Sequence, residues 1–304
     1  MTRGYVPLLL VVAAIWGASF MLIKVAVDEI EPIPMMALRL ALAAIVLFAL
    51  LLARRGWRTA RRDLRGAGLG VVLLGFANAA LPFTLIAWGE QHIDSSIAAI
   101  ANSPVPLFVA LLAVKFSPSE RVRGLRLVGI GLGFAGVAVL AGFNPEGGWW
   151  AVAGTLAVAG AALCYASSNL YTQVRLGGIA PLVIATGSSI AGALVLLPFS
   201  LFQIPDEVPS AEALGSVVVL GIVGTAIAYL FFYRMLAAYG ASRAALVTYL
   251  IPPIALVYGI VLLDERLTAG ALAGLVLTLA GVALASGLVG VARKREVVPA
   301  APHA

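Results

Sequence analysis

The sequence predicts an all-α membrane protein with ten transmembrane helices, arranged as two inverted five-helix repeats. Three observations lead to this fold class. Of the 304 residues, 62% are hydrophobic and 11% are charged, whereas about a quarter of the residues of a soluble domain are charged. The apolar residues come in runs of about 20, the length with which a helix crosses a bilayer. The two halves of the chain also resemble each other.

Ten apolar runs are long enough to cross a membrane. They cover residues 5–27, 33–53, 66–88, 95–115, 125–142, 149–171, 180–202, 212–233, 242–263 and 270–291. The first run could imitate a signal peptide, but it is long for one, carries Lys24 and lacks a clear cleavage site. We therefore expect it to be retained as a helix. The single cysteine, Cys164, lies inside a predicted span, so no internal disulfide is expected.

The charged residues indicate how the chain is oriented. With the N-terminus in the cytoplasm, nearly all of the 20 basic residues fall in cytoplasmic segments and most of the 14 acidic residues fall on the other side. An excess of Arg and Lys in cytoplasmic loops is the rule for membrane proteins. Both termini are therefore predicted to be cytoplasmic. We interpret the basic run at 54–65 as an anchor on anionic lipid rather than a nucleic-acid site.

Internal similarity defines the two repeats. LLGFANAALPF at 73–83 resembles VLGIVGTAIAY at 219–229, and HIDSSIAAIANSPVP at 92–106 lies over YGASRAALVTYLIPP at 239–253. Five is an odd number of spans, so the two halves insert with opposite orientations. Such inverted repeats are typical of carriers that work by alternating access around a site near the midplane. A duplicated structural bundle without transport function is the alternative.

The predicted boundaries of these units follow from the alignment. The first repeat covers 1–145, the second repeat covers 146–292, and a cytoplasmic tail covers 293–304.

Paired prolines interrupt corresponding spans. Pro104 and Pro106 lie near the middle of the fourth span, and Pro252 and Pro253 lie near the middle of the ninth. Proline leaves a carbonyl of the preceding turn without its donor, which is tolerated in a membrane where the carbonyl faces protein or a watery cavity. Interruptions at matching places in two repeats favour a substrate site there. A kink that only shapes packing is the alternative.

Polar and aromatic side chains at midplane depth are the candidate substrate-binding residues, since a polar group there is costly unless it is partnered. They are Trp16, Ser19, Asn78, Asn102, Ser103, Tyr165, Ser168, Asn169, Thr225, Tyr229, Thr248 and Tyr249, and the interrupting prolines Pro104 and Pro252 join them as candidates. Asn78 and Asn102 are the strongest candidates because an amide needs several partners. Each residue could instead make an interhelical hydrogen bond.

Charged residues are predicted to gather at the outer mouth. Apart from charges in the first two or last two residues of a span, Lys24 and Arg39 are the only charges within the predicted spans, and both lie toward the outer ends, near Glu90. Lys24 precedes Asp28 by one helical turn, a favourable distance for an ion pair. The group is either a structural ion-pair cluster or a place where a cation receives a substrate carboxylate at the exit.

The central part of each predicted span lacks Asp and Glu, and the two histidines, His92 and His303, lie outside the spans. Proton-driven carriers usually titrate a buried acid or histidine. The sequence therefore favours facilitated, downhill export, with coupling through water or through Glu90 as the alternative.

Short motifs carry a family resemblance. WGASF at 16–20, LRLALAA at 38–44, and ERL at 265–267 after a proline-containing span resemble the EamA family of the drug/metabolite transporter superfamily. The resemblance covers about residues 5–290 and is strongest to bacterial exporters of amino acids and related metabolites, such as aromatic amino-acid exporters. It implies ten helices, cytoplasmic termini, and a central cavity lined mainly by spans one, three, four, six, eight and nine.

The second half departs from this pattern, since Tyr165 replaces the tryptophan and Thr186 occupies the position of Arg39. These departures concern the substrate rather than the fold.

Other function classes lack their motifs. We find no HExxH, GxSxG or nucleotide-binding P-loop and no acidic cluster for a metal, so no enzyme activity, cofactor or metal is expected. The expected partners are a small-molecule substrate, namely an amino acid or similar metabolite, and the lipid bilayer, but no nucleic acid. Glycine-rich faces of the fifth and tenth spans favour packing within a monomer, with a dimer interface as the alternative.

Two alternatives of function stay open: proton-coupled drug or metabolite efflux, and a carrier of the same fold for a metabolite that is not an amino acid. Arginine far outnumbers lysine, as in GC-rich bacteria, so the expected location is a bacterial inner membrane.

Overall fold

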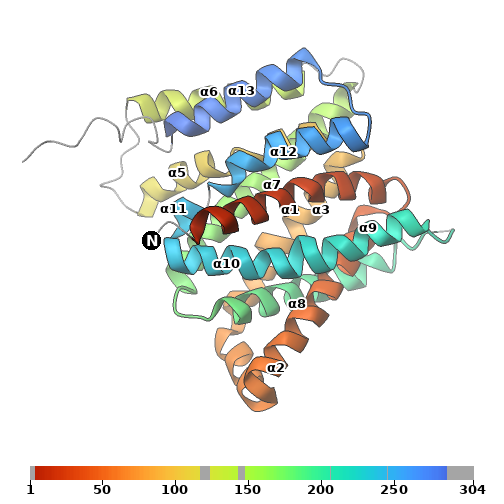
Figure 1. The fold of residues 1–304 in the computed structure, drawn as a ribbon, viewed down its shortest axis with the longest axis vertical. Helices are drawn as coiled ribbons and strands as arrows, with labels where there is room; N and C mark the ends of the chain where they lie inside the picture. Colours follow the sequence, from red (N-terminus) through yellow and green to blue (C-terminus); the bar gives the residue numbers. More distant parts are fainter. Residues whose placement is uncertain (1–3, 117–123, 143–147, 206, 245, 286–304) are drawn as a thin grey trace, which may run out of the picture.

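The computed structural model describes residues 4–116, 124–142, 148–205, 207–244 and 246–285, and this part of the chain is helical throughout, joined by turns (Figure 1). The helices are α1 (Tyr5–Val27), α2 (Pro32–Gly75), the π-helix η1 (Phe76–Ala80), α3 (Leu81–Glu90), α4 (Ser95–Asn102), α5 (Val105–Phe116), α6 (Leu125–Gly142), α7 (Gly148–Arg175), α8 (Pro181–Ser200), α9 (Ala211–Gly221), the π-helix η2 (Ile222–Ile227), α10 (Ala228–Tyr239), α11 (Ala241–Ala244), α12 (Val247–Leu262) and α13 (Ala269–Ala285).

Membrane-length helices dominate this architecture. Within the described ranges, 7 helical stretches are long and apolar enough to cross a membrane, and Val247–Leu262 and Ala269–Ala285 are shorter apolar helices. This confirms an all-α protein with membrane-length helices. The number of ten spans and the cytoplasmic termini stay predictions. The predicted tail at 293–304 lies outside the described residues.

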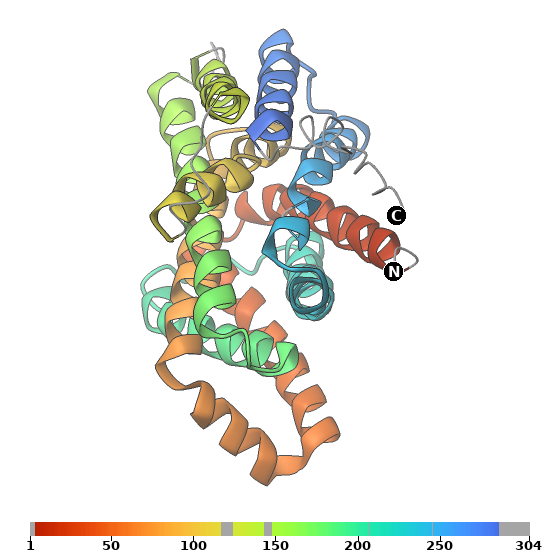
Figure 2. The same ribbon diagram turned by 90° about the vertical axis from the view of Figure 1, so that its left-hand side faces the viewer.

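The predicted second and third spans lie in one continuous helical stretch that is bent twice. Gly56 with φ 67° and Gly68 with φ 50° break the α-helical geometry of α2, and these positive φ values explain why glycine stands at both bends. The basic run forms the connector between them, where α2 turns back (Figure 2). Ala60 and Ala67 of the connector are buried, whereas its arginines at 58, 61, 62 and 65 are exposed. This agrees with a basic surface that can contact lipid headgroups.

A π-helical turn interrupts each of the predicted third and eighth spans. The sequence alignment of 73–83 with 219–229 places η1 directly over η2. π-helical turns are rare and occur frequently at functional sites. Their equivalent placement brings an irregular segment of each half into the interior, with Asn78 in η1 and Thr225 in η2.

The prolines interrupt the fourth span but not the ninth. Ser103 and Pro104 separate α4 from α5, and Pro106 falls in the first turn of α5, where its missing N–H costs no hydrogen bond. Pro252 and Pro253 instead lie inside α12, which continues through them. Our expectation of matching breaks at the prolines was therefore wrong for span nine, because a proline accepts helical φ values even where it removes a hydrogen bond.

The helices pack so that the two halves interlock. α12 packs against α1 and α4, α2 packs against α8, and α3 packs against α7. α6 and α13 form a separate pair at one side (Figure 1, top). A Cβ on Gly136 of α6 would meet the Gly274 carbonyl oxygen of α13 at 2.9 Å. Glycines of the fifth and tenth predicted spans thus pack against each other within the chain.

Candidate functional site

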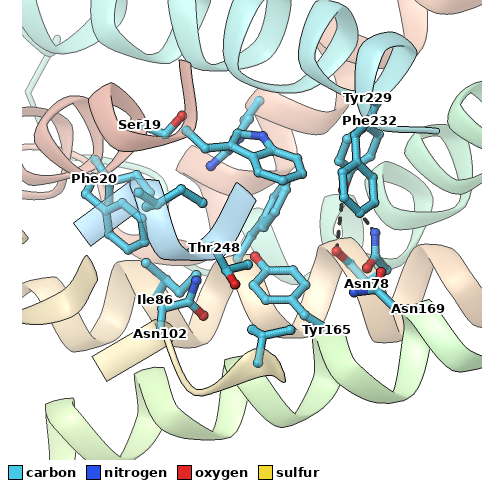
Figure 3. A pocket seen from close by; sticks show the side chains of 16 residues that line it. Ser19, Phe20, Asn78, Ile86, Asn102, Tyr165, Asn169, Tyr229, Phe232 and Thr248 are labelled. Atoms are coloured by element: carbon cyan, nitrogen blue, oxygen red, sulfur yellow. Dashed lines mark hydrogen bonds between the residues drawn. The ribbon is translucent and has the colours of Figure 1, made fainter. Parts of the chain in front are cut away.

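A cavity lies where helices of both halves meet (Figure 3). Its lining residues are Trp16, Ser19, Phe20, Ile23, Arg39, Asn78, Phe83, Ile86, Asn102, Val105, Tyr165, Asn169, Tyr229, Phe232, Thr248 and Ile251. They come from the predicted spans one, two, three, four, six, eight and nine. The resemblance implied all of these spans except span two, which contributes Arg39.

The structure brings together only part of the predicted site. Trp16, Ser19, Asn78, Asn102, Tyr165, Asn169, Tyr229 and Thr248 line the cavity. The other predicted residues, Ser103, Pro104, Ser168, Thr225, Tyr249 and Pro252, are absent from its lining. Ser103 Oγ donates to the Ile100 carbonyl at 2.6 Å, and the Tyr249 hydroxyl donates to the Val282 carbonyl at 2.8 Å. Ser103 therefore serves its own helix end, and Tyr249 links α12 to α13.

Sequence reasoning missed the apolar part of the lining. These residues are Phe20, Ile23, Phe83, Ile86, Val105, Phe232 and Ile251. The sequence criterion required a polar group at midplane depth, so it did not select these apolar residues. Helical spacing could have found several of them, because Phe20 and Ile23 follow Trp16 by four and seven residues and share its face.

Hydrogen bonds tie each π-helical segment to a helix of the other half, η1 to α10 and η2 to α1. Asn78 Nδ2 donates to the Tyr229 hydroxyl at 3.4 Å and to the Tyr233 hydroxyl at 3.3 Å, and the Tyr229 hydroxyl donates to the Asn78 carbonyl at 3.4 Å (Figure 3). Trp16 Nε1 donates to the Gly224 carbonyl in η2 at 3.2 Å. The wall between the halves is therefore both aromatic and hydrogen-bonded.

Asn102 differs from Asn78 in that its side-chain oxygen has no hydrogen-bond partner among the described residues. Its Oδ1 atom is buried and accepts no hydrogen bond from the described residues. The side chain lies beside Thr248 and Tyr165 at the cavity (Figure 3). A buried polar atom without a partner needs an explanation, such as a ligand or an ordered water.

Arg39 lies in the cavity rather than at the outer mouth. Its side chain is 3% exposed, Nε donates to Thr225 Oγ1 at 2.8 Å, and the guanidinium carbon lies 3.9 Å from the centre of the Phe83 ring. The predicted position was wrong because the position of a residue along a helix does not determine the direction of a long side chain. The Arg39 side chain extends from α2 toward η2.

Glu90 and Lys24 also differ from the predicted mouth cluster. Glu90 is 0% exposed, and neither carboxylate oxygen has a hydrogen-bond partner among the described residues. Lys24 Nζ donates to the backbone carbonyls of Glu90 at 2.7 Å and Ile93 at 3.3 Å. The expected ion pair with Asp28 is absent from the ion pairs of the described residues, which join Arg55 and Arg62 to Asp63.

A second, more polar cavity is lined by Lys24, whose neighbour Ile23 lines the first. Its charged lining residues are Lys24, Asp28, Asp94, Asp264, Glu265 and Arg266. The Glu265 carboxylate binds the first two residues of α4. Its Oε1 accepts from Ser95 N at 2.8 Å and from Ser95 Oγ at 2.6 Å, and its Oε2 accepts from Ser96 N at 3.1 Å. The described residues contain no group of three or more His, Cys, Asp or Glu side chains that could hold a metal.

Comparison with known proteins identifies the family. A model described as "EamA-like transporter family" matches residues 3–142 and again 152–287. The chain belongs to the EamA-like transporter family. This confirms the resemblance seen in the sequence, and it makes the protein a multi-pass membrane transporter rather than an enzyme.

Relatives of this EamA-family protein extend along most of the chain. An "Uncharacterized transporter" of Archaeoglobus fulgidus is 31% identical over 88% of this chain and 93% of its own length. A "Probable amino-acid metabolite efflux pump" of Salmonella typhimurium is 28% identical over 91% of this chain and 92% of its own length. A crystal structure of a protein with 20% identity has a TM-score of 0.67 and covers 93% of this chain and 96% of that chain, which supports the fold.

Proposed function

We propose that this EamA-family transporter exports small metabolites, most favourably amino acids, across a bacterial inner membrane. The observation that carries the proposal is the central cavity, whose wall is mainly aromatic and aliphatic with a few polar groups among them. Small-molecule sites typically combine such a wall with a few placed polar groups that set orientation. The Salmonella relative named as an amino-acid metabolite efflux pump supports the same substrate class.

Transport proceeds in this proposal by alternating access between two inverted repeats, 1–145 and 146–292. Both repeats contribute to the cavity, the first through Trp16 and Asn78 and the second through Tyr165 and Tyr229. The protein operates with both termini in the cytoplasm and as a monomer. Glu265 of the second repeat, which lines the polar cavity, is bonded to the start of α4 of the first, so this contact joins the two repeats.

Facilitated diffusion is the proposed energetic mode. None of the residues lining the central cavity is an acid or a histidine, so the cavity itself offers no ordinary proton carrier. Substrate would then move down its own gradient, and loaded substrate on one side would drive exchange with the other.

A second candidate, proton-coupled export, rests on Glu90. This carboxyl group is 0% exposed and unpartnered within the described residues, and such buried acids are the groups that coupled carriers titrate. Ile86, one turn earlier on α3, lines the central cavity, and Lys24 beside Glu90 lines the polar cavity. Lys24, Glu265 and Arg39 are the charged groups that act on Glu90 electrostatically.

Counterflow in liposomes tests the proposed function. Purified protein is sealed in vesicles loaded with one unlabelled amino acid, and a trace of the labelled form is added outside without any ion gradient. Transient accumulation supports an amino-acid carrier that needs no ion gradient. Absence of accumulation for every amino acid, in protein shown to be folded, contradicts the substrate class.

The same vesicles separate the two energetic modes. An imposed pH gradient without preloaded substrate should leave uptake at equilibrium if the carrier is facilitative. Uphill accumulation that is lost in Glu90→Gln, with Glu207→Gln at an exposed loop as the control, would establish proton coupling instead.

A further inference from the structure

We propose that Arg39 is the anion anchor of the central cavity, so that the carrier selects molecules with a carboxylate on an apolar or aromatic body. This inference rests on the proposed transport function and names the chemical feature that the cavity recognises. It also predicts that the α-amino group of an amino acid contributes less to binding than the carboxylate.

The first observation is a buried cation that makes no ion pair within the described residues, since the buried Glu90 carboxyl group acts on it only from beyond ion-pair distance. Arg39 is 3% exposed, and the ion pairs among the described residues join only Arg55 and Arg62 to Asp63. A guanidinium remains protonated in proteins, and a buried charge without a partner is strongly unfavourable. An anionic group of the substrate, bound in the cavity that Arg39 lines, would remove this cost during each transport cycle.

The second observation is that the protein holds the guanidinium but uses few of its donors. Nε donates to Thr225 Oγ1 at 2.8 Å, and Nη1 lies 3.9 Å from Met36 Sδ, a weak acceptor. The terminal nitrogens make no other hydrogen bond within the described residues. An arginine offers five N–H donors in a planar fork that matches a carboxylate. The unfilled donors are therefore suited to a bidentate bond with a substrate carboxylate.

The local fold explains why the guanidinium is held in place. The π-helical turn η2 lets the Thr225 hydroxyl donate to the Leu220 carbonyl five residues earlier, at 2.9 Å. This bond directs the hydroxyl proton away from Arg39 and leaves the oxygen free to accept from Nε. The Phe83 ring covers the guanidinium, with its centre 3.9 Å from the guanidinium carbon. Thr225 and Phe83 are thus positioning residues for Arg39.

The rest of the lining indicates the body of the substrate. Apolar and aromatic side chains such as Trp16, Phe20 and Ile251 surround the cavity, and no Asp or Glu is among its lining residues. A substrate ammonium would therefore meet neutral acceptors only, and Asn102 Oδ1 is one that lacks a partner in the described part of the protein. Charge complementarity is consequently stronger for the carboxylate than for the ammonium.

Matched ligands test this assignment in purified full-length protein. For leucine and for phenylalanine, binding of the amino acid is compared with that of its carboxamide, which lacks the carboxylate, and of its deaminated acid, which lacks the ammonium. Binding is followed by tryptophan fluorescence and by thermal stabilisation. We expect the carboxamides to bind at least about tenfold more weakly than the amino acids, as for a lost charge-assisted bond, and the deaminated acids to stay within a few-fold of them.

Substitution of Arg39 should remove this preference. Arg39→Gln is expected to weaken carboxylate binding about tenfold or more while leaving carboxamide binding unchanged, and Arg39→Lys should retain part of the preference. Arg58→Gln, which removes an exposed guanidinium of the α2 connector, is the matched control and should behave like the wild type. A purely structural role of Arg39 would weaken all ligands equally and would overturn the proposal.

The comparison of carboxylate and carboxamide binding by the wild type tests the anion anchor even if Arg39→Gln does not fold. Equal binding of carboxylates and carboxamides by the wild type, including binding of neither, overturns the anion anchor. Arg39-dependent binding of carboxylates without amino-acid counterflow would contradict the proposed function but support the anchor. Counterflow in Arg39→Gln with an unchanged KM for the amino acid would contradict the anchor but support the proposed function.

Discussion

The polar residues of the cavity are of two kinds, those that the protein satisfies itself and those that it leaves unpartnered. Asn78 belongs to the first kind, because its side chain bonds the hydroxyls of Tyr229 and Tyr233. Asn102 belongs to the second, because its Oδ1 atom is buried and unpartnered within the described residues. The first kind holds the two halves of the protein together, and the second is available to a ligand.

Two asparagines of the cavity allow a matched test of this distinction. Asn78→Ala should lower the free energy of unfolding by about 1 kcal/mol, as for an interhelical hydrogen bond in a membrane. Asn169→Ala removes an amide that lines the same cavity but makes no hydrogen bond to the described residues, so its effect on stability should be smaller. Thermal unfolding in detergent measures both, and an equal loss in the two variants would contradict the division.

At the scale of helices, two carboxylates bind the N-termini of helices from the other repeat. Glu29, between α1 and α2, accepts from Ser210 N at 2.6 Å and Ser210 Oγ at 2.7 Å at the start of α9. Glu265, after α12, binds the start of α4 in the same way. A carboxylate there satisfies free N–H groups and opposes the positive end of the helix dipole. These contacts fasten one repeat to the other.

The Glu29 contact predicts a pH dependence of stability. Hydrogen bonds from the Ser210 backbone and then its side chain lower the pKa of Glu29. The carboxylate therefore stabilises the fold fully above the usual glutamate pKa of about 4.3, and this contribution is lost as the pH falls through the lowered value.

Melting temperatures of the wild type and Glu29→Gln, measured between neutral and strongly acidic pH, check this dependence. The wild type should be more stable at neutral pH, and the difference should vanish in acid. A difference that persists in strong acid would show that Glu29 acts through something other than its charge.

The α6–α13 pair depends on close contact between glycines. A Cβ on Gly136 would meet the Thr278 backbone nitrogen at 2.7 Å and the Gly274 carbonyl oxygen at 2.9 Å, whereas a Cβ on Gly131 of the same helix would meet nothing within 4 Å. We expect Gly136→Ala to cost about 1–3 kcal/mol of stability through overpacking. Gly131→Ala should cost nothing, since alanine favours the helix. Comparable losses in thermal unfolding for both variants would contradict this packing.

At the scale of the whole molecule, the equivalent π-helices η1 and η2 both lie beside the cavity, since Asn78 of η1 lines it and η2 bonds to the lining residues Trp16 and Arg39. This arrangement fits inverted repeats that place their irregular segments in the interior, where irregular backbone is tolerated within a membrane protein. The two halves differ at the prolines, which separate α4 from α5 but lie inside α12. The two repeats are therefore related but not equivalent in structure.

Orientation in the membrane can be tested directly with single cysteines. In a Cys164→Ser background, Arg61→Cys in the α2 connector and Glu207→Cys between α8 and α9 place a thiol at two exposed positions. The positive-inside pattern predicts that an impermeant maleimide labels Glu207→Cys in intact cells and labels Arg61→Cys only after the membrane is opened. Labelling of both positions from the outside, or the reverse pattern, would contradict the predicted topology.

The sequence by itself determined the properties that depend on composition and period. Hydrophobic run lengths indicated the membrane helices, internal similarity indicated two related halves, and motifs such as WGASF at 16–20 indicated the EamA family. Depth along a span selected Trp16, Asn78 and Asn102, which line the cavity, but also Ser103, Ser168 and Thr225, which do not. Residue number measures position along a helix but not the direction in which a side chain points.

Only the tertiary structure decided which way each helix face and each long side chain points. Arg39 and Thr225 meet because α2 packs beside η2, and nothing in the spacing of two residues so distant in sequence predicts that contact. Glu90 was expected at the mouth, yet neighbouring helices bury it completely. The rotation of a helix about its axis and the choice of its neighbours are set by packing among all the helices together, and so they are decided only in the assembled fold.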